Sequence, residues 1–121
     1  VYYANYLKFA ERARTEILRE AGIVQRTMAE ELGIAFAVRS VNVEYLSPAR
    51  LDEALVVETT ILAVGGATAD GLQTVRRAED GAELARIAVK LACIRLAGGK
   101  PTRIPEPVRA ALSRHIVVTK A

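Results

Sequence analysis

The first 22 residues constrain the fold most, because they hold the only long amphipathic segment of the chain. Apolar residues recur there at intervals of three and four, which defines one face of a helix: Tyr6, Phe9, Ala10, Ala13, Ile17 and Ala21. Polar residues fall on the opposite face: Lys8, Arg12, Thr15 and Arg19. Gly22 follows as a natural carboxyl-terminal stop. The pattern predicts one long helix that buries one face.

Two charged residues lie at the border of this apolar face. Glu11 lies at its edge, and Arg14 lies slightly inside it. A charged side chain on a buried face needs a partner, and Glu11, three residues before Arg14, is the nearest one in sequence. We therefore expect Arg14 and Glu11 to pair.

The remainder of the chain is predicted to form mainly strands and turns. Extended segments are predicted at residues 34–46, 54–64, 72–78 and 83–96, short helices at 25–32 and 105–112, and a polar connection at 48–53. Turn signals are Gly65-Gly66, Asp70-Gly71, Asp80-Gly81 and Gly98-Gly99. The apolar tail at 116–119 could pair with a strand or dock. This order predicts one α+β domain over residues 1–121, with an antiparallel meander of about four strands.

Two of the predicted strands carry side-chain patterns that place them in the sheet. Residues 83–96 alternate, with five apolar side chains on one face: Ala85, Ile87, Val89, Leu91 and Cys93. Residues 54–64 are apolar on both faces, which favours a central strand or one that a partner chain covers. One helix covers one face only and leaves strand edges exposed, so we expect a homo-oligomer.

Composition narrows the classes of protein that fit. The hydrophobic content of 51% and charged content of 26% are ordinary for a globular protein. The net charge of +3 comes without a run of Lys or Arg, so no nucleic-acid site is expected. One Cys and one His argue against a disulfide within the chain and against a metal site. No signal peptide or apolar run of membrane-spanning length is seen, so the expected compartment is the cytoplasm.

Four stretches together resemble the hotdog-fold acyl-CoA thioesterases. They are Val-Tyr-Tyr-Ala-Asn-Tyr at 1–6 with Phe-Ala-Glu-Arg-Ala-Arg-Thr-Glu at 9–16, Val-Glu-Tyr-Leu-Ser-Pro-Ala-Arg-Leu-Asp at 43–52, the turn and strand at 80–93, and Gly-Lys-Pro-Thr-Arg-Ile-Pro at 99–105. The chain is most similar to the 4-hydroxybenzoyl-CoA thioesterase family, and within it to the Tol–Pal-associated (YbgC-type) subfamily. The resemblance covers essentially the whole chain and implies an antiparallel sheet wrapped around the long helix.

The resemblance also implies a catalytic arrangement. Members of the family carry a catalytic Asp a few residues before the Val-Tyr-Tyr motif, so this carboxylate and the first strand are expected upstream of Val1, outside this sequence. The backbone N–H of Tyr3 is the expected oxyanion donor, since a helix amino terminus offers free N–H groups and a positive dipole end. The YbgC-type subfamily often has His where Tyr3 stands, so Tyr3 resembles the hydroxybenzoyl type instead.

Each candidate side chain has a structural alternative. Tyr2 and Tyr6 either contact the substrate or only pack at the start of the helix. Glu11 is either a second carboxylate of the site or part of an ion pair within the helix. Coenzyme A carries phosphates, so basic side chains are candidates for binding it: Arg103 first, then Arg76, Arg77 and Lys90, which could equally belong to a solvated strand face. Cys93 is expected to be buried, and His115 has no visible partner.

The function expected from the resemblance is hydrolysis of an acyl-CoA to the free acid and coenzyme A. No cofactor or metal is expected, since coenzyme A enters as part of the substrate. The resemblance implies a homodimer or a homotetramer built as a dimer of dimers, with sites that use two chains. The alternative is a non-catalytic acyl-CoA-binding or scaffold protein of the same fold. A hydratase on this fold would need a His at the site, and His115 lies at the wrong end of the chain.

Overall fold

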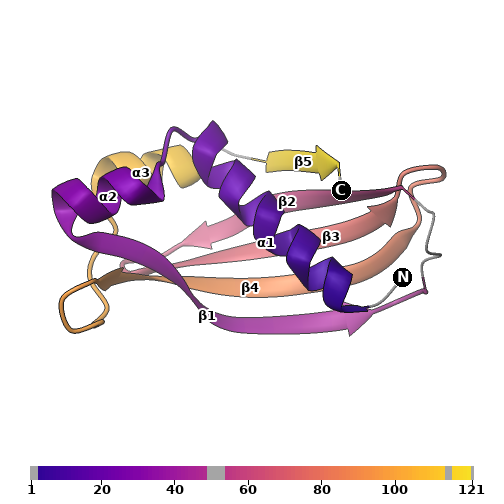
Figure 1. The fold of residues 1–121 in the computed structure, drawn as a ribbon, viewed down its shortest axis with the longest axis horizontal. Helices are drawn as coiled ribbons and strands as arrows, with labels where there is room; N and C mark the ends of the chain where they lie inside the picture. Colours follow the sequence, from indigo (N-terminus) through magenta and orange to yellow (C-terminus); the bar gives the residue numbers. More distant parts are fainter. Residues whose placement is uncertain (1–2, 49–53, 114–115, 121) are drawn as a thin grey trace.

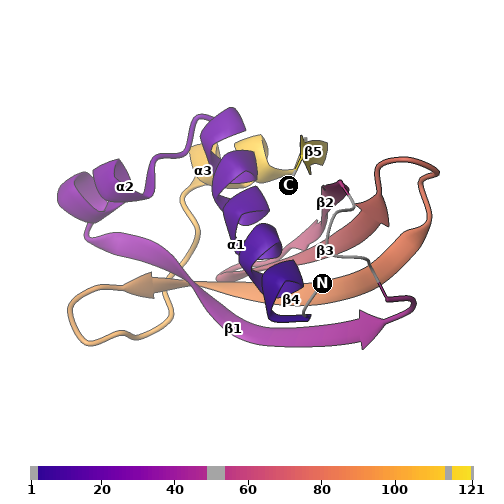
Figure 2. The same cartoon turned by 45° about the vertical axis from the view of Figure 1, so that its right-hand side comes forward.

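The computed structural model of the protein describes residues 3–48, 54–113 and 116–120; for residues 3–5 and 116–120 the description covers the backbone. Its elements follow in the order α1 (Tyr3–Glu20), α2 (Gln25–Leu32), β1 (Ile34–Tyr45), β2 (Leu55–Val64), β3 (Thr68–Arg77), β4 (Glu83–Arg95), α3 (Glu106–Leu112) and β5 (Ile116–Lys120). The long helix α1 lies across one face of the sheet, and α2 and α3 lie together near its carboxyl end (Figures 1 and 2).

The sheet has five strands in the order β1-β4-β3-β2-β5, and every neighbouring pair is antiparallel. The predicted α+β class and the antiparallel sheet around one long helix are confirmed. The predicted meander of four consecutive strands is wrong, because β1 pairs with β4 and not with β2. The apolar tail pairs with β2 as a fifth strand, with Val57 opposite Thr119. This places β2 between β3 and β5, as its two apolar faces predicted.

The predicted turn at Asp70-Gly71 is wrong, because both residues lie inside β3. Asp70 faces Lys90 across the strand pair, and its carboxylate lies 3.3 Å from the Lys90 Nζ atom. Gly71 lies at a close approach between strands and not at a turn, since a Cβ atom there would lie 3.3 Å from Val89 Cγ1 and would crowd it. The chain turns earlier, where the Gly65 N–H donates to the Thr68 carbonyl at 2.7 Å.

Glycines end both α1 and the β3–β4 hairpin, as the sequence predicted. Gly22 has a φ of +79°, and the next N–H, that of Ile23, donates back to the Leu18 carbonyl at 2.8 Å. At the hairpin, Gly81 has a φ of +74°, and the Asp80 side chain accepts the Ala82 N–H at 3.0 Å. The amino end of α1 lies at the same end of the sheet as this hairpin (Figure 1).

Two apolar clusters fill the space between α1 and the sheet. The first lies under the amino-terminal half of α1: Tyr6, Ala10, Ala13, Leu55, Val57, Val75, Leu84, Ala85 and Ile87. The second lies under the end of α1 and beneath α2 and α3: Leu18, Ile23, Met28, Ile34, Phe36, Ala69, Val89, Leu91, Cys93, Ile104 and Leu112. All five inward side chains predicted on β4 are buried.

Small side chains bring α1 close to the sheet, so enlarging one should destabilise the fold. Ala13, on the inner face of α1, is fully buried. We expect Ala13→Leu to lower the free energy of unfolding by about 1–3 kcal/mol, because the added atoms must push the helix outward. Urea denaturation would measure this. The exposed neighbour Arg12 is the control, and Arg12→Leu should change stability by less than about 0.5 kcal/mol. Equal midpoints for the two variants would contradict the packing described here.

Candidate active site

The amino end of α1 is the part of the described chain best suited to bind a developing negative charge. The helix begins at Tyr3 and runs for 18 residues, and its first turn contains no acidic side chain. The first four N–H groups of a helix have no partner within it, and the helix dipole adds positive potential at the same point. The Tyr3 amide belongs to this group. An anion or a polarised carbonyl oxygen would bind there.

Tyr6 supports this helix end from inside the core. Its side chain is fully buried in the cluster beneath α1. The ring lies 6.3 Å from the Tyr45 ring, centroid to centroid, near the end of β1. Tyr6 therefore fixes α1 against the sheet in this structure. Tyr2, the side chain of Tyr3 and His115 lie outside the described residues.

Arg14 has a different partner from the one that the sequence suggested. Its Nη1 atom donates to Gln73 Oε1 on β3 at 2.8 Å, whereas no ion pair between Arg14 and Glu11 forms. Burial lowers the pKa of the Arg14 guanidinium, and the negative charge of Glu11 partly opposes this shift. Glu11 itself is exposed. It lies eight residues beyond Tyr3, about 12 Å along the helix axis.

A cavity of about 430 Å³ lies between α1 and β1. Its lining includes polar and apolar side chains from both elements and from β4: Glu11, Arg14, Thr15, Leu18, Gln25, Phe36, Val38 and Leu91. The Gln25 side chain contributes by accepting the Phe36 backbone N–H at 3.0 Å. The α1 residues that line this cavity begin at Glu11, about 12 Å along the helix from Tyr3.

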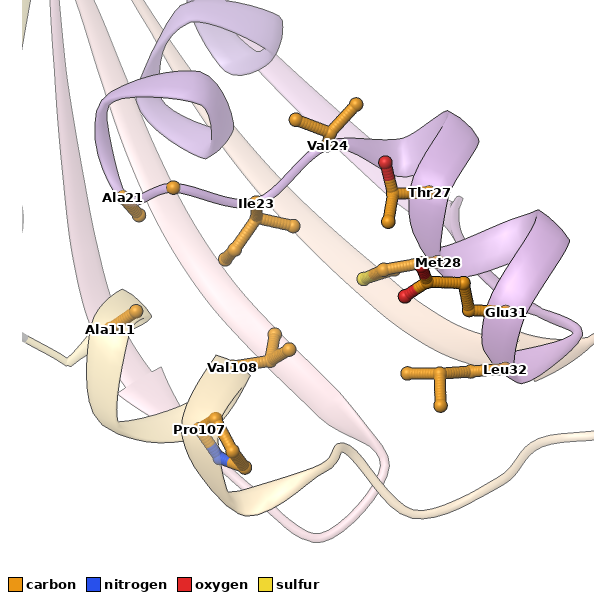
Figure 3. Close-up of a pocket in the computed structure, with 11 residues that line it drawn as sticks. Ala21, Ile23, Val24, Thr27, Met28, Glu31, Leu32, Pro107, Val108 and Ala111 are labelled. Atoms are coloured by element: carbon orange, nitrogen blue, oxygen red, sulfur yellow. The ribbon is translucent and has the colours of Figure 1, made fainter.

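A second cavity, of about 310 Å³, lies between α2 and α3. Figure 3 shows Ile23 and Met28 approaching it from one side and Val108 from the other. It lies at the carboxyl end of α1, roughly 27 Å from Tyr3 by the rise of the helix. That separation sets this groove apart from the candidate site.

The outer face of the sheet, opposite α1, holds two of the predicted phosphate-binding residues. Arg76 lies 3.3 Å from Glu83 and 3.7 Å from Glu58, on strands to either side of β3. Lys90 pairs with Asp70 on the same face. Both cations already interact with carboxylates on neighbouring strands. Their role in substrate binding stays a prediction.

The other two predicted cations lie at opposite ends of the sheet. Arg77 is held at the β3–β4 hairpin, where Nη1 lies 2.9 Å from Asp80 Oδ2. Arg103 follows Thr102, whose N–H donates to the Cys93 carbonyl at the far end of β4. The Arg103 side chain is 72% exposed, compared with 35% for Arg76 and 40% for Lys90, and its contact with Glu106 is 3.7 Å. Arg103 is therefore the most available of these cations.

Gln73 was not predicted from the sequence, although its side chain hydrogen-bonds to both α1 and β2. Its inward orientation was readable in principle, because it shares the face of β3 with Ala69 and Val75, which are both buried. A Gln between apolar neighbours on an inward face signals a buried hydrogen-bond network. Among the described residues, no three His, Cys, Asp or Glu side chains gather as a metal site would require, and no helix could span a membrane.

Comparison with known proteins agrees with this architecture. The sequence-family model of the thioesterase-like superfamily matches residues 1–112 of this chain. The acyl-CoA thioesterase YbgC of Haemophilus influenzae is 42% identical over 111 residues, which cover 92% of this chain and 80% of that protein. A 1,4-dihydroxy-2-naphthoyl-CoA thioesterase from Synechocystis superimposes with a TM-score of 0.85 at 21% identity, over 94% of this chain and 83% of that one. A probable thioesterase from Bartonella henselae gives 0.77 at 33% identity, over 87% and 85%.

Cys93 should behave as a buried structural residue. Its side chain is fully buried, and burial raises the pKa of the thiol, so little of the reactive thiolate exists at neutral pH. We expect the folded protein to react with a thiol reagent such as DTNB much more slowly than a free cysteine does, and the denatured protein to react fully. Absorbance of the released thionitrobenzoate would follow both reactions. Rapid labelling of the folded protein at pH 7 would contradict this assignment.

Proposed function

Because the chain belongs to the thioesterase-like superfamily, we propose that it hydrolyses acyl-CoA thioesters, with the amino end of α1 as the oxyanion-binding element. The observation that carries the proposal is the start of an 18-residue helix at Tyr3, which leaves that backbone N–H free to donate. The motif around it is the one that the resemblance associates with thioester cleavage. The cytoplasm, where coenzyme A thioesters are formed and consumed, is the compartment that this function implies.

The Tyr3 amide would act when charge develops on the thioester oxygen. A nucleophile adds to the carbonyl carbon, the oxygen takes up the electron pair, and donors at the helix end stabilise it. Collapse of this intermediate breaks the carbon–sulfur bond and releases coenzyme A as the thiolate, which takes up a proton. When water is the nucleophile the other product is the free acid; when a carboxylate attacks, water then hydrolyses the mixed anhydride to the free acid and the carboxylate. We propose, from the resemblance, that an Asp preceding Val1 supplies the base or the nucleophile. Glu11, about 12 Å along α1, is too far to act on a carbonyl held by Tyr3 of its own chain.

Arg103 lies too far from Tyr3 of the same chain to share one compact site. The ring of Tyr6 on α1 meets Tyr45, which pairs with Ala85 at one end of β4. The backbone next to Arg103 bonds to Cys93, eight residues farther along β4. At about 3.3 Å per residue, the two ends are roughly 26 Å apart. A second copy of the chain would remove this separation.

We propose that two copies pair through the exposed edge of β1. This strand is 12 residues long and has one free edge, and Val38, Val41 and Tyr45 on it are each more than 40% exposed. Such an edge invites strand pairing. A twofold axis would lay the Ile34 end of one β1 against the Tyr45 end of the other. Arg103 of one copy would then approach the α1 amino end of its partner, and each site would use both chains.

Replacing Tyr3 by proline tests the backbone donor directly. Proline lacks an N–H but is tolerated in the first turn of a helix, so Tyr3→Pro should remove the donor and leave α1 intact. We expect kcat for acyl-CoA hydrolysis to fall by about 10²–10³. Tyr3→Phe is the matched control and should stay within a few-fold of wild type. Equal activity of the two variants, with helix content retained in circular dichroism, would overturn the oxyanion role.

Mixing two impaired variants tests whether the site is shared. Arg103→Ala should raise KM for acyl-CoA by roughly tenfold, because a charge-assisted phosphate contact is lost. Arg26→Ala, at an exposed position of α2 that was never a binding candidate, should leave KM unchanged. If Tyr3→Pro and Arg103→Ala chains are unfolded together and refolded, half of the dimers are mixed, and each mixed dimer carries one intact site. Activity at low substrate should then recover to about a quarter of wild type. No recovery would show that each site lies within one chain.

A further inference from the structure

The side chain of Gln73 is a buried polar group between the two apolar clusters. Gln73 is fully buried on β3, with Val75 of the first cluster on one side and Ala69 of the second on the other. On α1, Arg14 lies between the buried residues Ala13 and Ile17. Gln73 on β3 and Arg14 on α1 therefore face each other at one turn of the helix.

Both ends of the Gln73 amide bind that turn. Its Oε1 atom accepts a hydrogen bond from Arg14 Nη1 at 2.8 Å, and its Nε2 atom donates to the Ala10 carbonyl at 2.8 Å. The second hydrogen of Nε2 goes to Thr59 Oγ1 on β2 at 3.1 Å. The amide thus links α1 to two neighbouring strands. Its orientation is fixed by two partners of defined type, because the Arg14 guanidinium can only donate and the Ala10 carbonyl can only accept, whereas the Thr59 hydroxyl can do either.

The turn of α1 that contacts this amide packs on the sheet through small side chains. Ala10 and Ala13 present only methyl groups to the sheet, so they offer low ridges for interdigitation. The larger buried side chains of the helix, Tyr6 and Ile17, lie on either side of this turn, so at the turn itself apolar contact alone resists sliding weakly. The amide resists sliding, because a shift of the helix would stretch its bonds to Ala10 and Arg14 together. Buried polar groups of this kind serve to select one arrangement among several of similar packing.

We propose that Gln73 is a positioning residue that sets the axial register of α1 and thereby the location of the Tyr3 amide relative to the thioester. This inference rests on the proposed function. Tyr3 lies seven residues before Ala10 on the same helix, so the amino end follows any displacement of the Ala10–Arg14 turn. Misplacement by about 1 Å of a group that acts on the transition state can lower a rate by about 10²-fold.

The test compares kcat and KM for two variants of similar stability. Gln73→Met keeps the length of the side chain and removes all three hydrogen bonds. Val75→Ala, two residues along the same face, opens a cavity in the core and leaves the amide in place. Both are assayed at a temperature at which each is fully folded by circular dichroism. We expect Gln73→Met to lower kcat at least tenfold with KM changed by less than about threefold, and Val75→Ala to keep wild-type kcat.

A second variant covers the case in which Gln73→Met does not fold. Gln73→Glu keeps an acceptor for Arg14 and loses the donor to Ala10, and its buried carboxylate can pair with the guanidinium. We expect a smaller fall in kcat, of about threefold to tenfold, again with little change in KM. Wild-type kcat in either folded variant, or an equal loss in Val75→Ala, would overturn the positioning role. A wild-type protein that hydrolyses no acyl-CoA would instead refute the proposed function.

Discussion

The packing of α1 against the sheet determines where the candidate site lies. Ala10 and Ala13 bring the helix backbone close to the strands, and Gln73 ties one turn of it to β3 and β2. The amino end of the helix, where the oxyanion donor is proposed, can only be as well placed as this contact allows. Stability and catalysis therefore share one interface, with the apolar clusters supplying most of the burial and the amide supplying the register.

The two faces of the sheet carry different kinds of interaction. Among the described residues, the face under α1 is mainly apolar, with the Gln73 network as its polar part. The outer face carries a line of charges across four strands, in which neighbouring side chains of opposite sign lie within 3.8 Å: Glu58, Arg76, Glu83, Arg86 and Glu44. Exposed pairs of this type contribute little to stability, and they keep this face polar. The exposed edge of β1 is the more apolar surface and the better candidate for contact between copies.

Local patterns predicted most of the elements. The spacing of apolar residues located α1, glycines located its end and the β3–β4 turn, and alternation on β4 identified its buried face. The turn predicted at Asp70-Gly71 was wrong because this dipeptide occurs both in turns and in strands with a close neighbour, as here beside Val89. The partner of Arg14 could not be read locally, since Gln73 is 59 residues away and the choice between it and Glu11 depends on how the helix is seated. The proposed division of the site between two chains likewise has no local signal in the sequence; the resemblance implied it, and the exposed edge of β1 and the distance to Arg103 support it.

A crystal structure with a non-hydrolysable acyl-CoA analogue, with a ketone in place of the thioester, would test the central claim most directly. We expect the ketone oxygen about 2.7–3.1 Å from the backbone nitrogen of Tyr3, with the coenzyme A phosphates beside Arg103 of a second copy paired through β1. A ketone bound away from the α1 amino end, or phosphates bound by the chain that supplies that helix, would contradict this claim.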